Sequence, residues 1–338
     1  MWHHSNAQPG KGTAANPQIA QVAVPHDVLA AFGWLSPATD IQAATPGFSG
    51  ALVWKITCQE QSFALKRWPV GQPVYFDLHA IHRLMLQARC AGLTVVPLVK
   101  QMIEGGSVLI HQGFQWDACS WQPGQPDHQP DDSRLEAAMT SLSRLHALWR
   151  TAHDRRHGVC TAVTLQYRRL SQWTSDEWDL LKKKCPSTGI LREAVCLLKK
   201  HREHALARLA PWLTRHVLLQ PCLGDVWADH VLYVDDDCTG LIDYGGVRYD
   251  HPAQDLARLI GSYTQGHATR RQFALSRYST LSEEMEQLSI VLDETGVLIG
   301  LSNWLRWLVL EERLFPDLAA RAMNRLEQLI SRLSTSAS

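Results

Sequence analysis

The stretch that decides the fold is Leu223-Gly-Asp-Val-Trp-Ala-Asp-His-Val-Leu-Tyr233, which is followed by Leu241-Ile-Asp-Tyr-Gly245. Each segment places an acidic residue, Asp225 or Asp243, at the end of a short apolar run. Strand ends bring side chains to a rim where loops build sites. One carboxylate there can orient a hydroxyl and accept its proton, while the other holds a divalent cation between phosphates. The spacing alone also fits a plainer interpretation, in which these residues and Asp235–Asp237 are turn residues of a surface hairpin.

A second pattern lies upstream, where a glycine-containing loop precedes one predicted strand and a lysine lies in the next. The loop is Thr45-Pro-Gly-Phe-Ser-Gly50, and the lysine is Lys66. Such a loop brings backbone N–H groups near phosphate oxygens, and a lysine adds a point charge to the same phosphates. Each feature alone is typical of ordinary turns and strands. Their order ahead of Asp225 and Asp243 favours a phosphate site.

Hydrophobic periodicity predicts a small β-rich part followed by a larger helical part. This order is typical of α+β proteins rather than of alternating βαβ units. We expect a flexible tail over residues 1–24, an N-lobe over 25–120 and a C-lobe over 121–338. The expected strands are 51–58, 62–68, 95–103, 107–116 (with Gly105-Gly106 as the turn before it), 217–223, 230–234 and 239–243. The expected helices are 25–35, 74–92, 132–150, 190–212, 252–263, 268–296, 299–314 and 317–334.

Four segments together resemble the aminoglycoside phosphotransferase and choline-kinase-like family, which is related to the protein kinases. The resemblance covers most of the chain and implies a bilobal protein-kinase-like α+β fold, with a small β-rich N-lobe and a larger, mainly helical C-lobe. It also implies transfer of the γ-phosphate of ATP to a hydroxyl or amine of a small molecule. The segments are Phe48-Ser-Gly-Ala to Lys66-Arg-Trp, Trp121-Gln-Pro-Gly124, Leu142-Ser-Arg-Leu-His146, and the Asp225 and Asp243 segments followed by Asp250-His-Pro-Ala-Gln-Asp255.

The resemblance implies a role for each matching residue. Asp225 is expected to be the catalytic base, and Asp243 is expected to bind Mg²⁺ between the β- and γ-phosphates. Lys66 is expected to contact the α- and β-phosphates. The other implied nucleotide contacts are the flap residues Gly47, Phe48, Ser49 and Gly50, and the hinge residues Gln115, Trp116 and Asp117.

Three departures from the family pattern affect this chemistry. Leu223 stands where the family has a histidine, and His230 stands where it has a metal-binding asparagine. With His230 as a metal ligand, we expect Mn²⁺ to serve as an alternative to Mg²⁺, because imidazole suits transition metals better than magnesium. Asp229 is one residue early, and its side chain is expected to point the other way. Third, the helix at 74–92 has no glutamate to pair with the strand lysine. Its polar candidates are His79, His82 and Gln87.

These departures leave two classes of function open. The chain is either an active small-molecule phosphotransferase or a catalytically impaired kinase-like module that binds nucleotide as a regulator or scaffold. Retention of Lys66, Asp225 and Asp243 favours the enzyme. An amino sugar, a choline-like alcohol and other metabolites all fit as the acceptor.

The amino-acid composition argues against some classes of binding partner. Lys and Arg together number 33, as do Asp and Glu, so the formal net charge is +0. Partners that bind through bulk charge, such as nucleic acids or anionic membranes, are therefore not expected. The eight cysteines are scattered and form no C-x-x-C pair, which predicts reduced thiols in a cytoplasmic protein. Apolar runs are interrupted by charges and the N-terminal segment is polar, so we expect neither a membrane-spanning helix nor a signal peptide.

Several other residues are open to structural interpretations. Asp255 is expected to cap its helix or to brace the catalytic loop. Trp227 either stacks on a substrate or packs under that loop. Tyr263, Trp304 and Trp307 have the periodicity of core residues.

Overall fold

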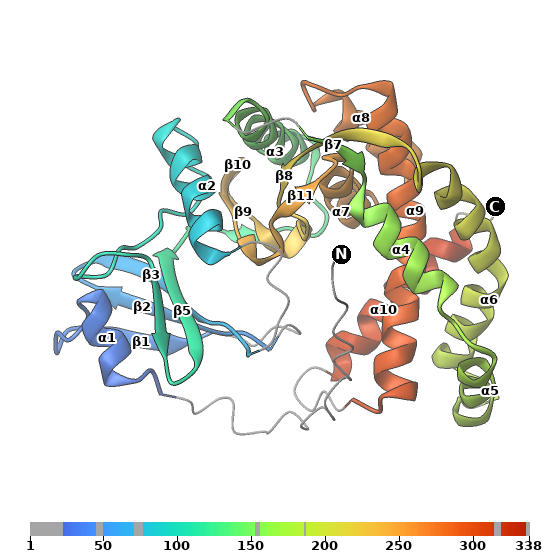
Figure 1. The fold of residues 1–338 in the computed structure, drawn as a ribbon, viewed down its shortest axis with the longest axis horizontal. Helices are drawn as coiled ribbons and strands as arrows, with labels where there is room; N and C mark the ends of the chain where they lie inside the picture. Colours follow the sequence, from blue (N-terminus) through green and yellow to red (C-terminus); the bar gives the residue numbers. More distant parts are fainter. Residues whose placement is uncertain are drawn as a thin grey trace, which may run out of the picture.

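The computed structural model describes residues 23–44, 50–70, 77–152, 156–185, 187–313 and 319–335. Among these residues, a five-stranded sheet lies at one end of the molecule, and a larger helical part with two three-stranded sheets lies at the other (Figure 1). The predicted order of a small β-rich part followed by a larger helical part is confirmed.

The five-stranded sheet is antiparallel and carries Lys66 near its centre. Buried and partly exposed residues alternate along β2, as expected for a strand with one face on a core. The predicted hairpin of β2 and β3 is confirmed, and Lys66 of β3 pairs with Asp117 of β5 in register. In sheet order, the strands are β1 (Asp40–Ala43), β2 (Leu52–Cys58), β3 (Gln61–Arg67), β5 (Phe114–Ser120) and β4 (Val108–His111).

A small core lies between this sheet and helix α1 (His26–Phe32). Val28 and Phe32 of α1 pack with the buried side chains of the sheet. Trp54 and Trp116 stack within this core, with ring centroids 5.4 Å apart. The buried apolar face of the helix therefore fixes it against one side of the sheet.

The predicted strand over 95–103 is wrong. These residues form only an isolated bridge between Val99 and Cys119, because Val95, Val96 and Val99 are buried in the larger core instead of pairing along a ladder. The hairpin forms downstream between β4 and β5. Its turn is Gln112-Gly113, where both residues have positive φ (50° and 76°), as a two-residue hairpin turn requires.

Helix α2 (Leu78–Cys90) joins the larger core. Its buried residues, which include Ile81, Leu84 and Met85, belong to the core of the helical part rather than to the core under α1. The side chain of Asp77 caps the helix by accepting a hydrogen bond from the backbone N–H of His79. The predicted helix over 74–92 is confirmed from residue 78, and residues 74–76 lie outside the described residues.

The helical part holds the remaining elements (Figure 1). Its sheets have the orders β10-β9-β6 and β11-β8-β7. Its helices are α3 (Asp132–Ala152), α4 (Thr161–Ser171), α5 (Ser175–Lys184), α6 (Ile190–Leu209), α7 (Ala253–Thr264), α8 (Ala268–Ser276), α9 (Glu283–Leu305) and α10 (Ala319–Thr335). Its strands are β6 (Gln125–Pro126), β7 (Arg156–Val159), β8 (His216–Cys222), β9 (Val231–Val234), β10 (Asp237–Leu241) and β11 (Arg248–Asp250).

The division of the late helices differs from the prediction. The expected helix over 268–296 is broken after α8, because Ser282 begins α9 by accepting a hydrogen bond from the backbone N–H of Met285. Helix α9 then runs through the predicted break at 296–299. Together with the π-helical turn that follows, it is the one helix of the described chain that is long and apolar enough to cross a membrane. The most apolar 18-residue stretch of this helix is 72% buried, as is typical of the core helix of a folded domain.

Two expectations about side chains are confirmed. All eight cysteines lie in the described chain, and all are free. Tyr263 and Trp304 are buried in the larger core, and Trp307 packs against it.

Candidate active site

The predicted lysine and the second aspartate meet. Lys66 Nζ lies 2.8 Å from Asp243 Oδ1, and the two side chains are 20% and 38% exposed. Asp243 follows β10 with a positive φ of 61° and caps a short 3₁₀ turn that begins at Tyr244. The nearby ammonium of Lys66 is the main reason why the pKa of Asp243 lies well below its usual value. The carboxylate is therefore ionised at neutral pH.

The first aspartate lies in a loop that buried hydrogen bonds hold in place. The backbone N–H groups of Leu223 and Gly224 donate to the Asp255 carboxylate at 2.6 and 2.7 Å. Asp255 also contacts the His146 ring at 2.9 Å. The predicted brace by Asp255 is thus confirmed, and it fixes the backbone directly before Asp225.

Asp225 itself has a half-exposed side chain. Its carboxylate forms an ion pair with Arg258 of α7. The turn before it depends on Gly224, which has a φ of 76° and lies so close to the Gly246 carbonyl that an added Cβ would be 2.2 Å from its oxygen. The segment after Asp243 therefore packs directly on the loop that carries Asp225.

His230 links the two aspartates. Its Nδ1 donates to the backbone carbonyl of Asp225 at 2.6 Å, and its Nε2 accepts a hydrogen bond from Trp227 Nε1 at 3.1 Å. Because a carbonyl only accepts and an indole N–H only donates, this ring is neutral with its proton on Nδ1. Nε2 also lies 3.7 Å from Asp243 Oδ2. A metal-ligand role for His230 requires Trp227 to release this nitrogen.

The Asp229 carboxylate has other partners. It lies 3.0 Å from His128 Nε2 and 3.4 Å from Arg325 of α10. The guanidinium carbon of Arg325 lies 3.9 Å from the centroid of the Trp227 ring. In this arrangement Trp227 packs between the loop histidine and an arginine, which favours the second of the two alternatives, packing at the loop, over stacking on a substrate.

The predicted flap falls largely outside what the structure describes. Gly47, Phe48 and Ser49 lie outside the described residues. Gly50 directly precedes β2, with a φ of 76° and open space around its Cα. A residue with a side chain would be strained at this position.

The predicted hinge residues lie inside β5. Gln115, Trp116 and Asp117 are flanked by β4, and Trp116 and Asp117 also pair with β3. Trp116 is 1% exposed and belongs to the small core. Interior strand positions use their backbone groups in the ladder, so a free backbone edge is expected only after β5 ends at Ser120.

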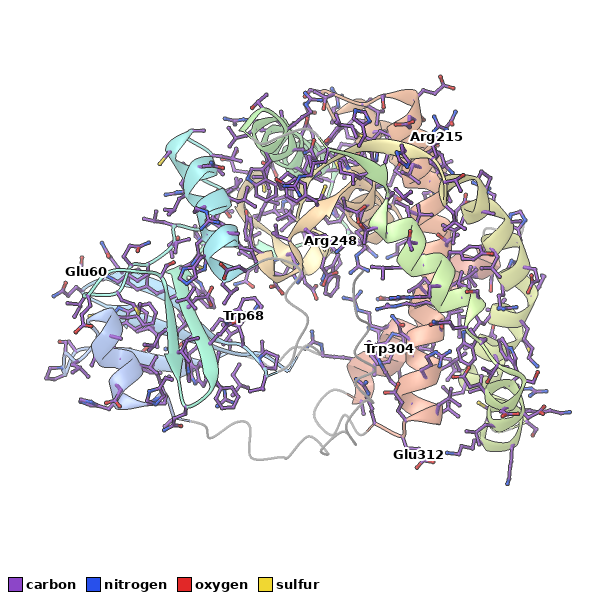
Figure 2. All side chains as sticks on the ribbon, viewed as in Figure 1. Glu60, Trp68, Arg215, Arg248, Trp304 and Glu312 are labelled. Atoms are coloured by element: carbon purple, nitrogen blue, oxygen red, sulfur yellow. The ribbon has the colours of Figure 1, made fainter. Side chains whose placement is uncertain are left out.

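Trp68 is a site residue that the sequence reasoning missed. The Lys66 ammonium lies 3.9 Å from the centroid of its ring. Figure 2 shows Trp68 on the side of the sheet that is turned toward the helical part. The signal in the sequence is the spacing of two residues between Lys66 and Trp68, which places both side chains on one face of an extended chain.

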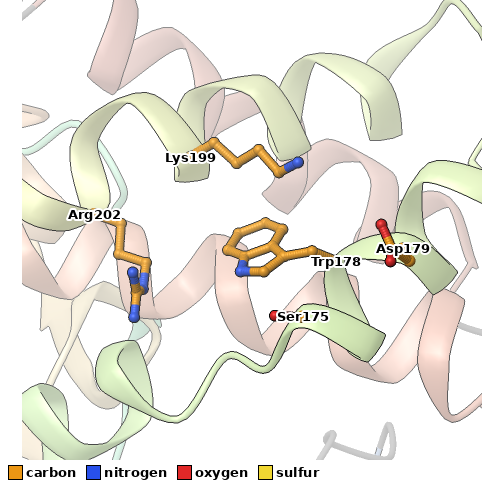
Figure 3. Close-up of a pocket in the computed structure, with 5 residues that line it drawn as sticks. All are labelled: Ser175, Trp178, Asp179, Lys199 and Arg202. Atoms are coloured by element: carbon orange, nitrogen blue, oxygen red, sulfur yellow. The ribbon is translucent and has the colours of Figure 1, made fainter.

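A separate shallow pocket lies between α5 and α6. In Figure 3, Trp178 lies between Lys199 and Ser175, with the Lys199 ammonium 5.0 Å from the centroid of the Trp178 ring. None of the predicted site residues lies on these two helices.

Comparisons with known proteins identify the family and the fold of this chain. The sequence model of the phosphotransferase enzyme family matches residues 40–288. A spectinomycin phosphotransferase in complex with ADP and spectinomycin has a TM-score of 0.59 at 10% identity, over 88% of this chain and 93% of that chain. An aminoglycoside phosphotransferase from Alicyclobacillus acidocaldarius subsp. acidocaldarius has a TM-score of 0.58 at 15% identity, over 93% and 96% of the two chains.

A third solved structure is similar as well. Amicoumacin kinase in complex with AMP-PNP and Ca²⁺ has a TM-score of 0.52 at 11% identity, over 86% of this chain and 88% of that chain. No curated protein matches the sequence. At these identities the solved structures establish the fold, and they confirm the kinase-like α+β fold that the resemblance implied.

Proposed function

Because the chain belongs to the phosphotransferase enzyme family, we propose that it transfers the γ-phosphate of ATP to a hydroxyl or amine of a small molecule. The observation that carries this proposal is the ion pair between Lys66 and Asp243. It brings a strand lysine and an ionised carboxylate together next to the loop that carries Asp225. Phosphoryl transfer needs such a combination of positive charge, a metal-binding carboxylate and a base.

In the proposed site, Lys66 contacts the α- and β-phosphates and Asp243 holds Mg²⁺. A half-exposed, ionised carboxylate offers the oxygen ligands that Mg²⁺ prefers. When bound, the metal supplies neutralisation of the phosphate charge. We do not include His230 as a ligand, because both of its ring nitrogens are engaged in hydrogen bonds within the loop. In this proposal Mn²⁺ replaces Mg²⁺ only by binding to Asp243.

Asp225 is the proposed base. Its backbone is fixed through Asp255, and its side chain is half-exposed, so an acceptor hydroxyl has access to it. Arg258 pairs with Oδ1, and we assign the acceptor's proton to Oδ2. Positioned proton acceptors of this kind contribute about 10²- to 10⁴-fold to a rate.

The proposed nucleotide site extends into the sheet. We assign the flap over the phosphates to Gly47, Phe48, Ser49 and Gly50. We assign the adenine contact to the backbone after β5, at Gln122, since the strand interior is occupied by its neighbours. The Trp121 N–H and the Pro123 carbonyl on either side are bonded to Ser62 and Thr239. The nucleotide then lies between a proposed N-lobe over 25–120 and a proposed C-lobe over 121–338.

An ADP-release assay tests this function. Native protein is offered ATP, Mg²⁺ and a panel of hydroxyl- and amine-bearing metabolites, and is compared with Asp225→Asn. We expect acceptor-dependent ADP release that the Asp225→Asn variant loses while it keeps its affinity for ATP. Asp235→Asn is the matched control, because it makes the same chemical change at an exposed turn of the neighbouring hairpin. Equal turnover in Asp225→Asn and native protein would remove the base assignment.

A second candidate function is a kinase-like module that binds nucleotide without catalysis. Two contacts favour it: the ion pair between Arg258 and the proposed base, and the use of both His230 nitrogens inside the loop. This alternative predicts ATP affinity that does not depend on divalent metal, together with no ADP release on any acceptor.

A further inference from the structure

Lys66 has two partners of different kinds. One is the Asp243 carboxylate, 2.8 Å away, which comes from a distant part of the chain. The other is the face of the Trp68 ring, 3.9 Å from the ammonium, which comes from the same stretch of sheet. A cation over an indole face is attracted by the electrons of the ring. If Asp243 holds a metal, as proposed, the Trp68 ring is the partner that stays with Lys66.

The Trp68 ring is itself held on two sides. Its Nε1 donates to Asp117 Oδ1 at 2.8 Å. An added Cβ on Gly245 would lie 2.7 Å from the ring, so the backbone after Asp243 packs tightly on it. Trp68 as a whole is 8% exposed. It therefore has little freedom to move away from the ammonium.

Asp117 connects this ring to helix α2. Its second oxygen, Oδ2, lies 2.9 Å from His82 Nε2. The other ring nitrogen of His82 lies 2.7 Å from Ser107 Oγ. Because a carboxylate only accepts, His82 Nε2 carries the proton in this contact. Both carboxylate oxygens of Asp117 thus accept hydrogen bonds, Oδ1 from Trp68 and Oδ2 from His82 of α2.

The packing of α2 holds His82 in place. It is 4% exposed and lies on the buried face of α2 with Ile81 and Met85, which pack in the larger core. The contacts therefore run without interruption from the core of the helical part, through His82, Asp117 and Trp68, to the ammonium of Lys66.

We propose that His82, Asp117 and Trp68 form a positioning network that sets the orientation of Lys66 for nucleotide binding. The proposal rests on the nucleotide role assigned to Lys66 above. In this account α2 orients the lysine through the His82 ring and a hydrogen-bonded carboxylate, without a carboxylate of its own in contact with the ammonium. These three are positioning residues, since they act on the phosphates only through Lys66.

A double-mutant cycle tests the network. The variants are His82→Ala, Trp68→Phe and the double variant, and the readout is the Kd for ATP with Mg²⁺, measured by calorimetry because Trp68 is itself fluorescent. Phenylalanine keeps an aromatic face but removes the N–H that donates to Asp117. We expect each single variant to weaken ATP binding about fivefold, because each removes one hydrogen bond to Asp117. The double variant should bind ATP no more weakly than whichever single variant binds it more weakly.

Thermal unfolding separates positioning from packing. A merely structural role predicts that the weakening of ATP binding follows the loss of stability from variant to variant. The network predicts one weakening of ATP binding that the two single variants and the double variant share, even where their losses of stability differ. Because both side chains bond Asp117, their losses of stability are not expected to add. His82→Leu fills a similar buried volume and replaces His82→Ala if the latter does not fold. His79→Ala, on the exposed face of α2, is the control that should leave Kd unchanged.

Lys66→Met in the same assay keeps the two proposals apart. If Lys66→Met leaves the Kd unchanged, the proposed nucleotide role of Lys66 fails, and the network has no function to serve. If Lys66→Met weakens binding but the single variants of His82 and Trp68 do not, or if their effects multiply, the network is overturned and the proposed function stands.

Discussion

Lys66 Nζ lies 2.8 Å from Asp243 Oδ1, although 177 residues of chain separate the two side chains. Both are partly exposed, and exposed ion pairs contribute only about 0–1 kcal/mol to stability. The contact therefore contributes little to the free energy of folding, and its importance lies in the two groups that it brings together. It joins the β-rich part to the loop region at the point where charge for phosphate binding is proposed.

Lys66→Met separates these two contributions. We expect the free energy of unfolding to fall by less than about 1 kcal/mol, because the ion pair is partly exposed. ATP affinity in the presence of Mg²⁺ should fall much more, since a point charge on the phosphates is lost. Urea unfolding and calorimetry measure the two effects. A large loss of stability with unchanged affinity would show that the contact is structural.

Gly224→Ala tests the geometry of the catalytic loop. The new Cβ would lie 2.2 Å from the Gly246 carbonyl oxygen at a φ of 76°, so the backbone before Asp225 must shift. We expect a loss of about 1–3 kcal/mol of stability together with loss of ADP release. Gly105→Ala is the control, because Gly105 has a φ of 88° but open space around it. Equal effects of the two variants on ADP release would contradict a special role for this turn.

His230→Asn tests whether this histidine binds the metal. Its nitrogens are engaged by Trp227 and by the carbonyl of Asp225, so we expect the ratio of ATP affinities in Mg²⁺ and Mn²⁺ to stay unchanged. Turnover should fall, because the loop loses two hydrogen bonds. His128→Asn, at an exposed histidine beside Asp229, is the control. A shift of preference from Mn²⁺ toward Mg²⁺ in His230→Asn would restore His230 as a ligand.

The pH dependence of stability is expected to report on His251. Burial lowers its pKa to about 4, and the ring accepts a hydrogen bond from the backbone N–H of Ala253, which requires a neutral nitrogen. A histidine in the unfolded chain takes up a proton near its usual pKa of 6.5, so acidification favours unfolding between these two pKa values. At about pH 5 this amounts to about 2 kcal/mol.

Urea unfolding of native protein and His251→Gln at about pH 7.5 and about pH 5 checks this value. The native protein should lose more stability on acidification than His251→Gln by about that amount. His216→Gln, at an exposed strand position, should behave like the native protein. An equal loss in the native protein and in His251→Gln would refute the assignment.

Local patterns predicted the parts of the fold that depend on neighbouring residues. The alternation along 51–58 and 62–68 predicted the hairpin that carries Lys66, and short apolar runs before Asp225 and Asp243 predicted the loops that carry them. The hairpin turn was misplaced because Gly105-Gly106 and Gln112-Gly113 carry similar turn signals. Core packing of Val95 to Val99, which decides between them, is a long-range effect.

Local sequence patterns could not predict the contacts that support the site. Asp117 appeared as a hinge residue by position, but its side chain connects His82 to Trp68 across three separate elements. His82 was recognised only as one of several polar residues on its helix. Its partner is 35 residues away, and no local spacing encodes such a contact.

The most direct test of the account is calorimetric titration of ATP into native protein and into Asp243→Asn, with and without Mg²⁺. The account predicts that Mg²⁺ strengthens ATP binding to the native protein and that Asp243→Asn loses this gain, because the amide is a poor replacement for an ionised ligand. Native protein that binds ATP equally well without the metal, or a variant that keeps the full gain, would contradict the central claim that Asp243 holds the metal at the phosphates.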